Sequence, residues 1–289
     1  MWFWYGLAAA FVGAIEVVIG KKILNKVGAP LFTWSLFTLN LPLFALLSLE
    51  TGIGQLNYLF WIGTFCSSVL FVFSKTMSNQ SIKRGLLSKL FPLSSLSVLF
   101  TYLFGLFILS EQLSRTAVLG IILIISGTYI LNVDRAHEGL LEPFKILFRE
   151  KLSLVFIFAT LISSLSGIFD KLGLINIQPS NTAFALFIEG VFLSLFLLFY
   201  MIRYEKGWIR ELKGNFLPLF LNSQIYGISN LLTFSGFTSG PVALTSGVKR
   251  LQILFIFLLG LWLLKDKPGK HTVLAALIMI LGVILVKAG

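Results

Sequence analysis

Two adjacent cations lie in an apolar stretch near the end of the chain. Lys249 and Arg250 lie near the middle of residues 240–265, a stretch long and apolar enough to cross a bilayer. A charge at the centre of a membrane span costs about 2.5–3.5 kcal/mol, so the pair must face a partner, a ligand or a water-filled cavity. A lysine beside an arginine is suited to binding a phosphate or a carboxylate there. The alternative is internal ion pairing that only holds helices together.

Three further ionisable residues lie in apolar stretches: Glu16, Lys89 and Glu189. Their depth along a helix, at about 1.5 Å per residue, matches Glu16 with Lys89 and Glu189 with Lys249. Such pairs either stabilise the bundle or exchange partners when substrate or protons bind. A carboxylate in apolar surroundings binds a proton more readily, which makes Glu16 a candidate coupling residue. Near a helix end it can instead extend to water.

The stretch 216–236 has polar side chains along one side, at spacings of four, three and four: Asn222, Tyr226, Ser229 and Thr233, with Gln224 and Asn230 beside them. Amides and hydroxyls in hydrocarbon are costly unless bonded, so this stripe suits a cavity wall. Hydrogen bonding between helices is an equally good explanation. The sequence predicts a set of substrate-binding residues: Lys249, Arg250, Lys89, Asn222, Tyr226 and Asn230.

The composition excludes a water-soluble domain. Of the 289 residues 57% are hydrophobic, 29 are Phe and only 12% are charged, which is typical of a polytopic membrane protein. The single Cys66 excludes an intrachain disulfide, and neither His137 nor His271 has a metal-ligand spacing. A nucleophile–base spacing and a Gly-rich phosphate loop are also missing from the sequence. We therefore expect no enzyme, no metal and no cofactor.

Breaks in hydropathy predict an all-α fold with ten helices, near 2–20, 31–49, 57–77, 85–109, 115–132, 152–171, 182–201, 216–236, 241–264 and 272–287. The net charge of +11 fits basic loops better than a nucleic-acid partner. With ten spans, the loops on one side contain 17 Lys and Arg residues and those on the other side contain 3. This predicts a multi-pass protein of the cytoplasmic (plasma or inner) membrane with both termini on the non-cytoplasmic side.

The two halves of the chain repeat each other. An offset of 155 residues superposes Gly85 on Gly240, Gly105 on Gly260, Glu111 on Asp266, and Gly127 on Gly282. Five helices are an odd number, so the second unit must be inverted relative to the first. We expect two inverted five-helix repeats, at 1–132 and 152–289, joined by a polar linker at 133–151. This architecture is typical of alternating-access transporters, whose substrate site lies near the midplane between the repeats.

The paired segments 88–132 and 247–287 resemble the EamA type of the drug/metabolite transporter superfamily. Pro92, the segment FGLFILSE that ends at Glu111, and Gly120 with Gly127 carry the resemblance. The second copy departs from it, with Asp266 in place of the usual Glu and Ala275 in place of the usual Gly. The resemblance covers essentially the whole chain and implies ten helices in two inverted repeats around a central cavity.

Two finer resemblances point to different substrates. Val248-Lys249-Arg250 is similar to the Lys-Arg pair of plastid triose-phosphate/phosphate translocators, where the pair binds phosphate, and Lys89 lies near the position of another lysine of that family. In contrast, AIEVVIGKK around Glu16 resembles the first helix of small multidrug resistance proteins, whose glutamate binds protons and cations in turn.

These observations predict a secondary transporter of a small polar metabolite with an anionic group. The alternatives are a proton-coupled exporter of amino acids or cationic amphiphiles that uses Glu16, and a flippase of a polyprenyl-phosphate-linked headgroup. The expected partners are a small-molecule substrate and membrane lipid, without nucleic acid, and we expect a monomer.

Overall fold

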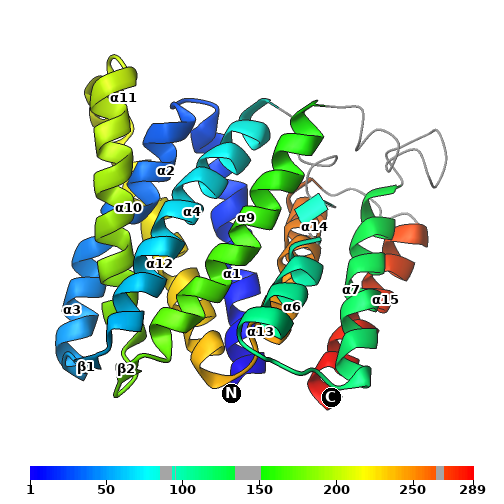
Figure 1. The fold of residues 1–289 in the computed structure, drawn as a ribbon. Coiled ribbons are helices and arrows are strands. Elements are labelled where there is room, and N and C mark those ends of the chain that lie inside the picture. The colour runs from blue at the N-terminus through cyan, green and yellow to red at the C-terminus, as the bar shows by residue number, and fades with distance from the viewer. Residues whose placement is uncertain (85–92, 95, 134–150, 265–269) are drawn as a thin grey trace.

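A computed structural model describes residues 1–84, 93–94, 96–133, 151–264 and 270–289, which form long helices that run side by side (Figure 1). The helices are α1 (Trp2–Leu24), α2 (Ala29–Thr38), α3 (Leu41–Thr51), α4 (Tyr58–Arg84), α6 (Leu96–Ile108), α7 (Arg115–Val133), α9 (Lys151–Leu174), α10 (Thr182–Tyr204), α11 (Trp208–Gly214), α12 (Phe216–Ser239), α13 (Val242–Lys249), α14 (Leu251–Leu264) and α15 (Lys270–Ala288).

The predicted helical class is confirmed. Among the described residues, five helical stretches are long and apolar enough to cross a membrane, by length and composition: Ala29–Glu50, Tyr58–Arg84, Lys151–Leu174, Thr182–Tyr204 and Val242–Leu259. Three further apolar helices in this part of the chain are shorter. The sequence did not predict the short helix α11 or the antiparallel pair of two-residue strands, β1 (Gln55–Leu56) and β2 (Ile177–Gln178). The predicted linker lies almost wholly outside the described residues, as do residues 85–92 of the predicted helix 85–109.

Both termini lie at the same face of the bundle (Figure 1). An even number of membrane crossings requires this arrangement. The β1–β2 pair lies at the same face as the termini, and α11 lies at the opposite face (Figure 1). Which of these faces is cytoplasmic remains a prediction from the Lys and Arg bias.

The predicted helix 31–49 is wrong as a single element, because the chain breaks between α2 and α3 at Leu39 and Asn40. Pro42 lacks an N–H and its ring would clash with the carbonyl four residues earlier in a continuous helix. Side-chain amides satisfy the carbonyls that the break exposes. Asn40 Nδ2 donates to Leu36 O at 2.6 Å, and Gln224 Nε2 of α12 donates to Leu39 O at 2.8 Å.

The predicted helix 241–264 is also interrupted, at Arg250 between α13 and α14. The turn here is tighter than an α-helical turn: Arg250 N donates to Gly247 O at 3.1 Å, and Ile253 N donates to Arg250 O at 3.0 Å. These are three-residue hydrogen bonds of the 3₁₀ type, which often occur where a helix changes direction. The interruption places a cation at a bend rather than along a straight helix.

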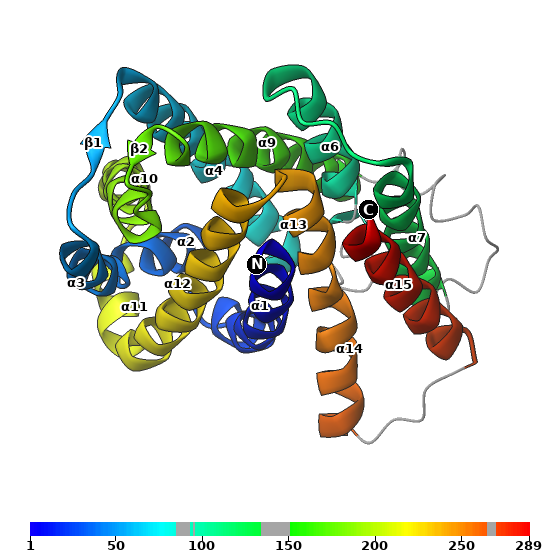
Figure 2. The ribbon, with the colours of Figure 1, turned by 90° about the horizontal axis from the view of Figure 1, so that it is seen from below.

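The helices pack in pairs that each combine the first and second halves of the chain. Helix α4 packs along α9, α12 along α1, and α7 along α15, while α10 covers α2 and α3. Seen from below, α7 and α15 lie side by side at one edge of the bundle (Figure 2). The contact of α4 with α9 has a counterpart in the contact of α12 with α1, with the roles of the two halves exchanged.

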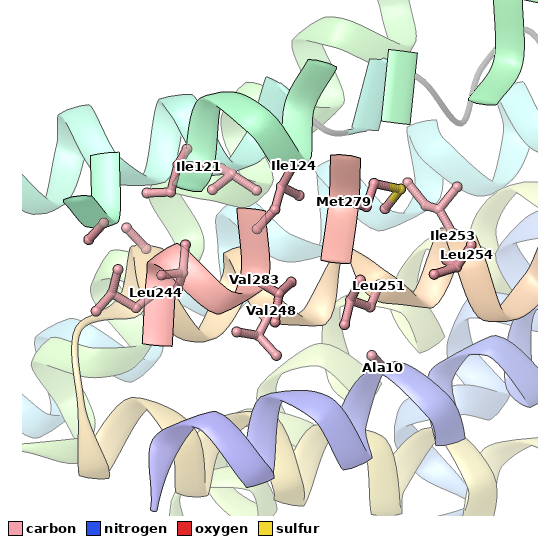
Figure 3. Close-up of a cluster of buried hydrophobic side chains, with 14 of the residues drawn as sticks. Ala10, Ile121, Ile124, Leu244, Val248, Leu251, Ile253, Leu254, Met279 and Val283 are labelled. Atoms are coloured by element: carbon pink, nitrogen blue, oxygen red, sulfur yellow. The ribbon is translucent and has the colours of Figure 1, made fainter. Parts of the chain in front are cut away.

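A cluster of buried apolar side chains joins this edge to the centre of the bundle (Figure 3). It is built from α1, α6, α7, α13, α14 and α15, and its members include Ala10, Val98, Ile121, Ile124, Leu244, Val248, Leu251, Met279 and Val283. Lipid tails are as apolar as these side chains, so their stabilising effect within a membrane comes from close packing rather than from removal from water. The cluster holds α13, and with it Lys249 and Arg250, against its neighbours.

Glycines let the backbones of α7 and α15 approach closely. A Cβ atom on Gly120 would lie 2.5 Å from Gly282 O, and one on Gly282 would lie 2.7 Å from Gly120 O. Because both obstacles are backbone atoms, a larger residue could be accommodated only by separating the helices. Small residues at such contacts are the usual means of close packing between membrane helices.

We expect Gly282→Ala to destabilise the protein by about 1–3 kcal/mol, since the added methyl overpacks a backbone contact. Thermal unfolding of the purified protein in detergent measures the effect. Gly214→Ala is the matched control, because a Cβ there meets nothing within 4 Å. Equal midpoints for the two variants would contradict the close approach of α7 and α15.

Candidate functional site

A polar cavity lies between the helices of the two halves. It is lined by side chains from α2, α3, α4, α6, α9, α10, α12, α13 and α14, and its volume is about 160 Å³. A water molecule needs about 10–15 Å³ of such space, so the cavity has room for roughly ten waters or one small solute. Its charged lining residues are Asp170, Glu189, Lys249 and Arg250.

Lys249 and Arg250 form the basic part of the cavity. Lys249 Nζ donates to Thr233 Oγ1 of α12 at 2.8 Å, and Arg250 Nη2 donates to Ser97 Oγ of α6. The buried Arg250 Nε has no hydrogen-bond partner. Among the residues that the structure describes, no carboxylate lies within 4.0 Å of either cation. Hydroxyl groups therefore hold the pair, which leaves its charge uncompensated by an ion pair.

Glu189 and Lys249, which the sequence matches in depth, form no ion pair within 4.0 Å in the structure. Both residues line the cavity, but Glu189 has Asp170 of α9 as its charged neighbour, whereas Lys249 interacts electrostatically with Glu16, Arg250 and Lys75. Similar depth along two helices does not determine which face of each helix a residue occupies. Lys89, the predicted partner of Glu16, lies outside the described residues.

Asp170 and Glu189 form an acidic part of the same cavity. Glu189 is buried in α10, and Asp170 is partly buried in α9. Ser67 of α4 donates a hydrogen bond to Asp170 Oδ1 and also lies within interaction range of the Glu189 carboxyl. The cavity thus contains an acidic and a basic group of residues on different helices.

Sequence analysis did not single out Asp170, although it lies inside the predicted helix 152–171. Its position next to the end of that helix made it resemble an interfacial carboxylate. A usable signal was the polar stripe that it completes, since Ser163, Ser166 and Asp170 are spaced by three and four residues. Ser163 lines the cavity with Asp170, and Ser166 contacts Ser67 at 2.9 Å between the hydroxyl oxygens.

The predicted polar stripe of α12 serves both of its proposed purposes. Tyr226, Asn230 and Thr233 line the cavity, whereas Ser229 Oγ donates to Ala9 O of α1 at 3.0 Å. Asn222 is fully buried and does not line the cavity. The stripe therefore forms a cavity wall at some positions and a helix–helix contact at others.

Glu16 lies beside the cavity rather than in its lining. It is buried in α1 next to the amide of Asn222, although neither amide atom makes a well-formed hydrogen bond. Lys75 interacts with Glu16 electrostatically, and its Nζ lies 4.9 Å from the centre of the Tyr226 ring, a cation–π contact. Lys75 lies near the end of the predicted helix 57–77, and α4 extends past it to Arg84.

An ion pair lies next to residues that line the cavity. Lys171 Nζ of α9 lies 2.5 Å from Glu111 Oε1 and donates to Gly240 O at 2.8 Å. Glu111 Oε2 also accepts from Val242 N, 3.1 Å away, at the start of α13. These contacts join α9, the segment around Glu111 and the start of α13. They lie at the border of the cavity, because Asp170 and Val242 both line it.

Within the described ranges, His, Cys, Asp and Glu residues form no group of three that could hold a metal ion. Cys66 is a free thiol on α4. The polar groups of the cavity are therefore carboxylates, amides, hydroxyls and cations, which bind solutes by charge and hydrogen bonding.

The fold and the cavity together define a polytopic α-helical membrane protein with a solute-sized polar site between its two halves. The model of the EamA-like transporter family matches residues 1–133 and 151–288, and the chain belongs to this family. Members of this family, within the drug/metabolite transporter superfamily, are membrane transporters and not enzymes, as the sequence predicted.

The fold is also similar to that of a solved structure titled only as a crystal structure of a protein. The TM-score is 0.77 at 15% sequence identity, and the match covers 99% of this chain and 97% of the other. This likeness concerns the fold. No match is found among curated proteins.

We expect Lys171→Met to destabilise the protein by about 1–3 kcal/mol, because it leaves the Glu111 carboxylate without its cation. The double variant Lys171→Met/Glu111→Gln removes both charges and should recover part of the loss. Thermal unfolding of the wild type, Lys171→Met, Glu111→Gln and the double variant gives the coupling free energy between the two residues. Additive losses in the double variant would show that the pair does not act as a unit.

Proposed function

We propose that the protein is a secondary transporter that moves a small polar metabolite with an anionic group, a phosphate or a carboxylate. The observation that carries this proposal is that Lys249 and Arg250 line the cavity without a carboxylate partner among the described residues. Two partly buried cations held only by hydroxyl groups favour an anionic ligand, and Arg250 Nε is a donor without a partner in the structure.

The proposed mechanism is alternating access by two inverted repeats, residues 1–132 and 152–289, joined by a polar linker at 133–151. The reciprocal packing of α4 on α9 and of α12 on α1 supports it, because two units related by a twofold axis make each contact twice. In this mechanism one repeat rocks against the other around the cavity, and a monomer is sufficient.

Two alternatives have less support. In a proton-coupled exporter of amino acids or cationic amphiphiles, Glu16 would contact the substrate, but it does not line the cavity. In a flippase of a polyprenyl-phosphate-linked headgroup, the site would hold a large polar group, whereas the volume of about 160 Å³ suits a small solute.

Counterflow in proteoliposomes loaded with inorganic phosphate or a small organic phosphate tests the proposal. We expect Lys249→Ala and Arg250→Ala each to lower the rate about tenfold or more, since each removes a charge-assisted hydrogen bond. Lys249→Arg should retain part of the activity, and Lys213→Ala, at an exposed position of α11, should retain all of it. Anion transport that survives both alanine substitutions in folded protein would contradict the proposed clamp.

The proposed orientation places both termini on the non-cytoplasmic side of the cytoplasmic membrane. We expect a membrane-impermeant maleimide to label Ile53→Cys in intact cells and to leave Lys213→Cys unlabelled, both in a Cys66→Ser background. Ile53 is 63% exposed beside β1, at the face of the termini, and Lys213 lies on α11 at the opposite face. The reverse labelling pattern would overturn the orientation.

A further inference from the structure

The carboxyl groups of Asp170 and Glu189 lie in the cavity without a countercharge. In the part of the chain that the structure describes, no Lys or Arg nitrogen lies within 4.0 Å of either group. Lys171 follows Asp170 in the sequence, but its Nζ is bonded to Glu111 and to Gly240 O. Two neighbouring carboxylates out of water repel each other, and both are costly to keep ionised.

One hydroxyl group serves both carboxyls. Ser67 donates to Asp170 Oδ1 and also interacts with Glu189, yet a hydroxyl carries a single proton. Ser166 does not relieve this shortage, because its hydroxyl contacts Ser67 itself, at Oγ and at the carbonyl oxygen. The hydrogen bonds of the described residues therefore leave acceptor capacity on both carboxyls.

Two residues that line the cavity also have a buried polar atom without a well-formed hydrogen bond. These atoms are Asn40 Oδ1 and the Tyr226 hydroxyl, which has the Asn230 side chain nearby, and the two residues are only 2% and 6% exposed. The amide of Asn40 is oriented by its Nδ2, which donates to Leu36 O at 2.6 Å, so the free atom is an acceptor. A buried acceptor without a donor favours a ligand that brings one.

We propose that Asp170 and Glu189 form a binding site for one positive charge, with Ser67, Asn40 and Tyr226 as its neutral oxygen ligands. The positive charge can be a cation from solution, which is a proton or an alkali ion. It can also be the ammonium group of a solute. Carboxylate, amide and hydroxyl oxygens suit each of these. The site shares the cavity of the proposed function, but it does not depend on anion binding by Lys249 and Arg250.

Binding of a cation to the purified full-length protein tests this site directly. Thermal unfolding is measured in detergent at low ionic strength, with chloride as the only anion. Protons are supplied by a change from about pH 8 to about pH 6. The other cations are added as sodium chloride, potassium chloride and methylammonium chloride, and choline chloride is the bulky control. We expect the cation that binds to raise the midpoint by about 2–4 °C or more in the wild type.

The response must depend on both carboxyls. Asp170→Asn and Glu189→Gln should each lose it, whereas Glu50→Gln, an exposed carboxyl on α3, should keep it. Other ionisable groups near the site are Glu16, Tyr226, Lys75, Lys249 and Arg250, so Glu16→Gln and Lys249→Ala are included as controls that should also keep it. If cations stabilise Lys249→Ala and the wild type shows no phosphate counterflow, the cation site is supported. The same result refutes the anion clamp and leaves the cation site standing.

Infrared spectroscopy of the wild type is the second measurement, and it does not require a folded variant. Binding of methylammonium or an alkali ion should change the carboxylate bands, and loading by a proton should produce a protonated carboxyl band at the lower pH. No stabilisation by any cation or by acid, with infrared bands unchanged throughout, would overturn the proposal. A stabilisation of Asp170→Asn and Glu189→Gln as large as that of the wild type would also overturn it.

Discussion

The hydrocarbon core of a membrane supplies no water, so the protein must satisfy its own polar groups there. This constraint accounts for the two interruptions next to the cavity. At Leu39 and Asn40, side-chain amides donate hydrogen bonds to the carbonyl oxygens that the broken helix exposes. At Arg250, tight turns maintain the backbone hydrogen bonds while the helix bends. Both interruptions place polar side chains at the cavity, where carboxylates and cations have an environment other than lipid.

The charges in the cavity are arranged by helix packing rather than by ion pairing. Helix α13 is held by the apolar cluster with α1, α7 and α15, and it presents Lys249 and Arg250 to hydroxyl groups. Helices α9 and α10 present Asp170 and Glu189, which interact with each other. Unlike charges that do not neutralise one another within the protein remain available to a ligand. This arrangement underlies both the proposed anion clamp and the proposed cation site.

Much of the fold could be predicted because long apolar helices have a strong sequence signature. A few positions, among them Gly120 and the segment before Glu111, carried the resemblance to the family, and the family model matches residues 1–133 and 151–288. The helix interruptions were missed because neither Asn40 nor Arg250 disrupts an apolar stretch enough to suggest a break. Asp170 and Lys75 were missed because they lie near predicted helix ends, where charge normally indicates contact with water. The charged neighbours of Glu189 could not be predicted, because the side of a helix that faces a neighbour depends on packing and not on position along the helix.

The central claim is that one cavity has an acidic and a basic part that are both accessible to solutes. It is tested most directly by the reaction rates of two single-cysteine variants, Ser246→Cys beside the cations and Gly167→Cys beside Asp170, in a Cys66→Ser background. A Cβ at Gly167 has space, since its nearest neighbour would lie 4.0 Å away. The account predicts that an anionic methanethiosulfonate reagent reacts faster than a cationic one at position 246, and that the preference reverses at position 167. The same preference at both positions, or no reaction at either, would contradict it.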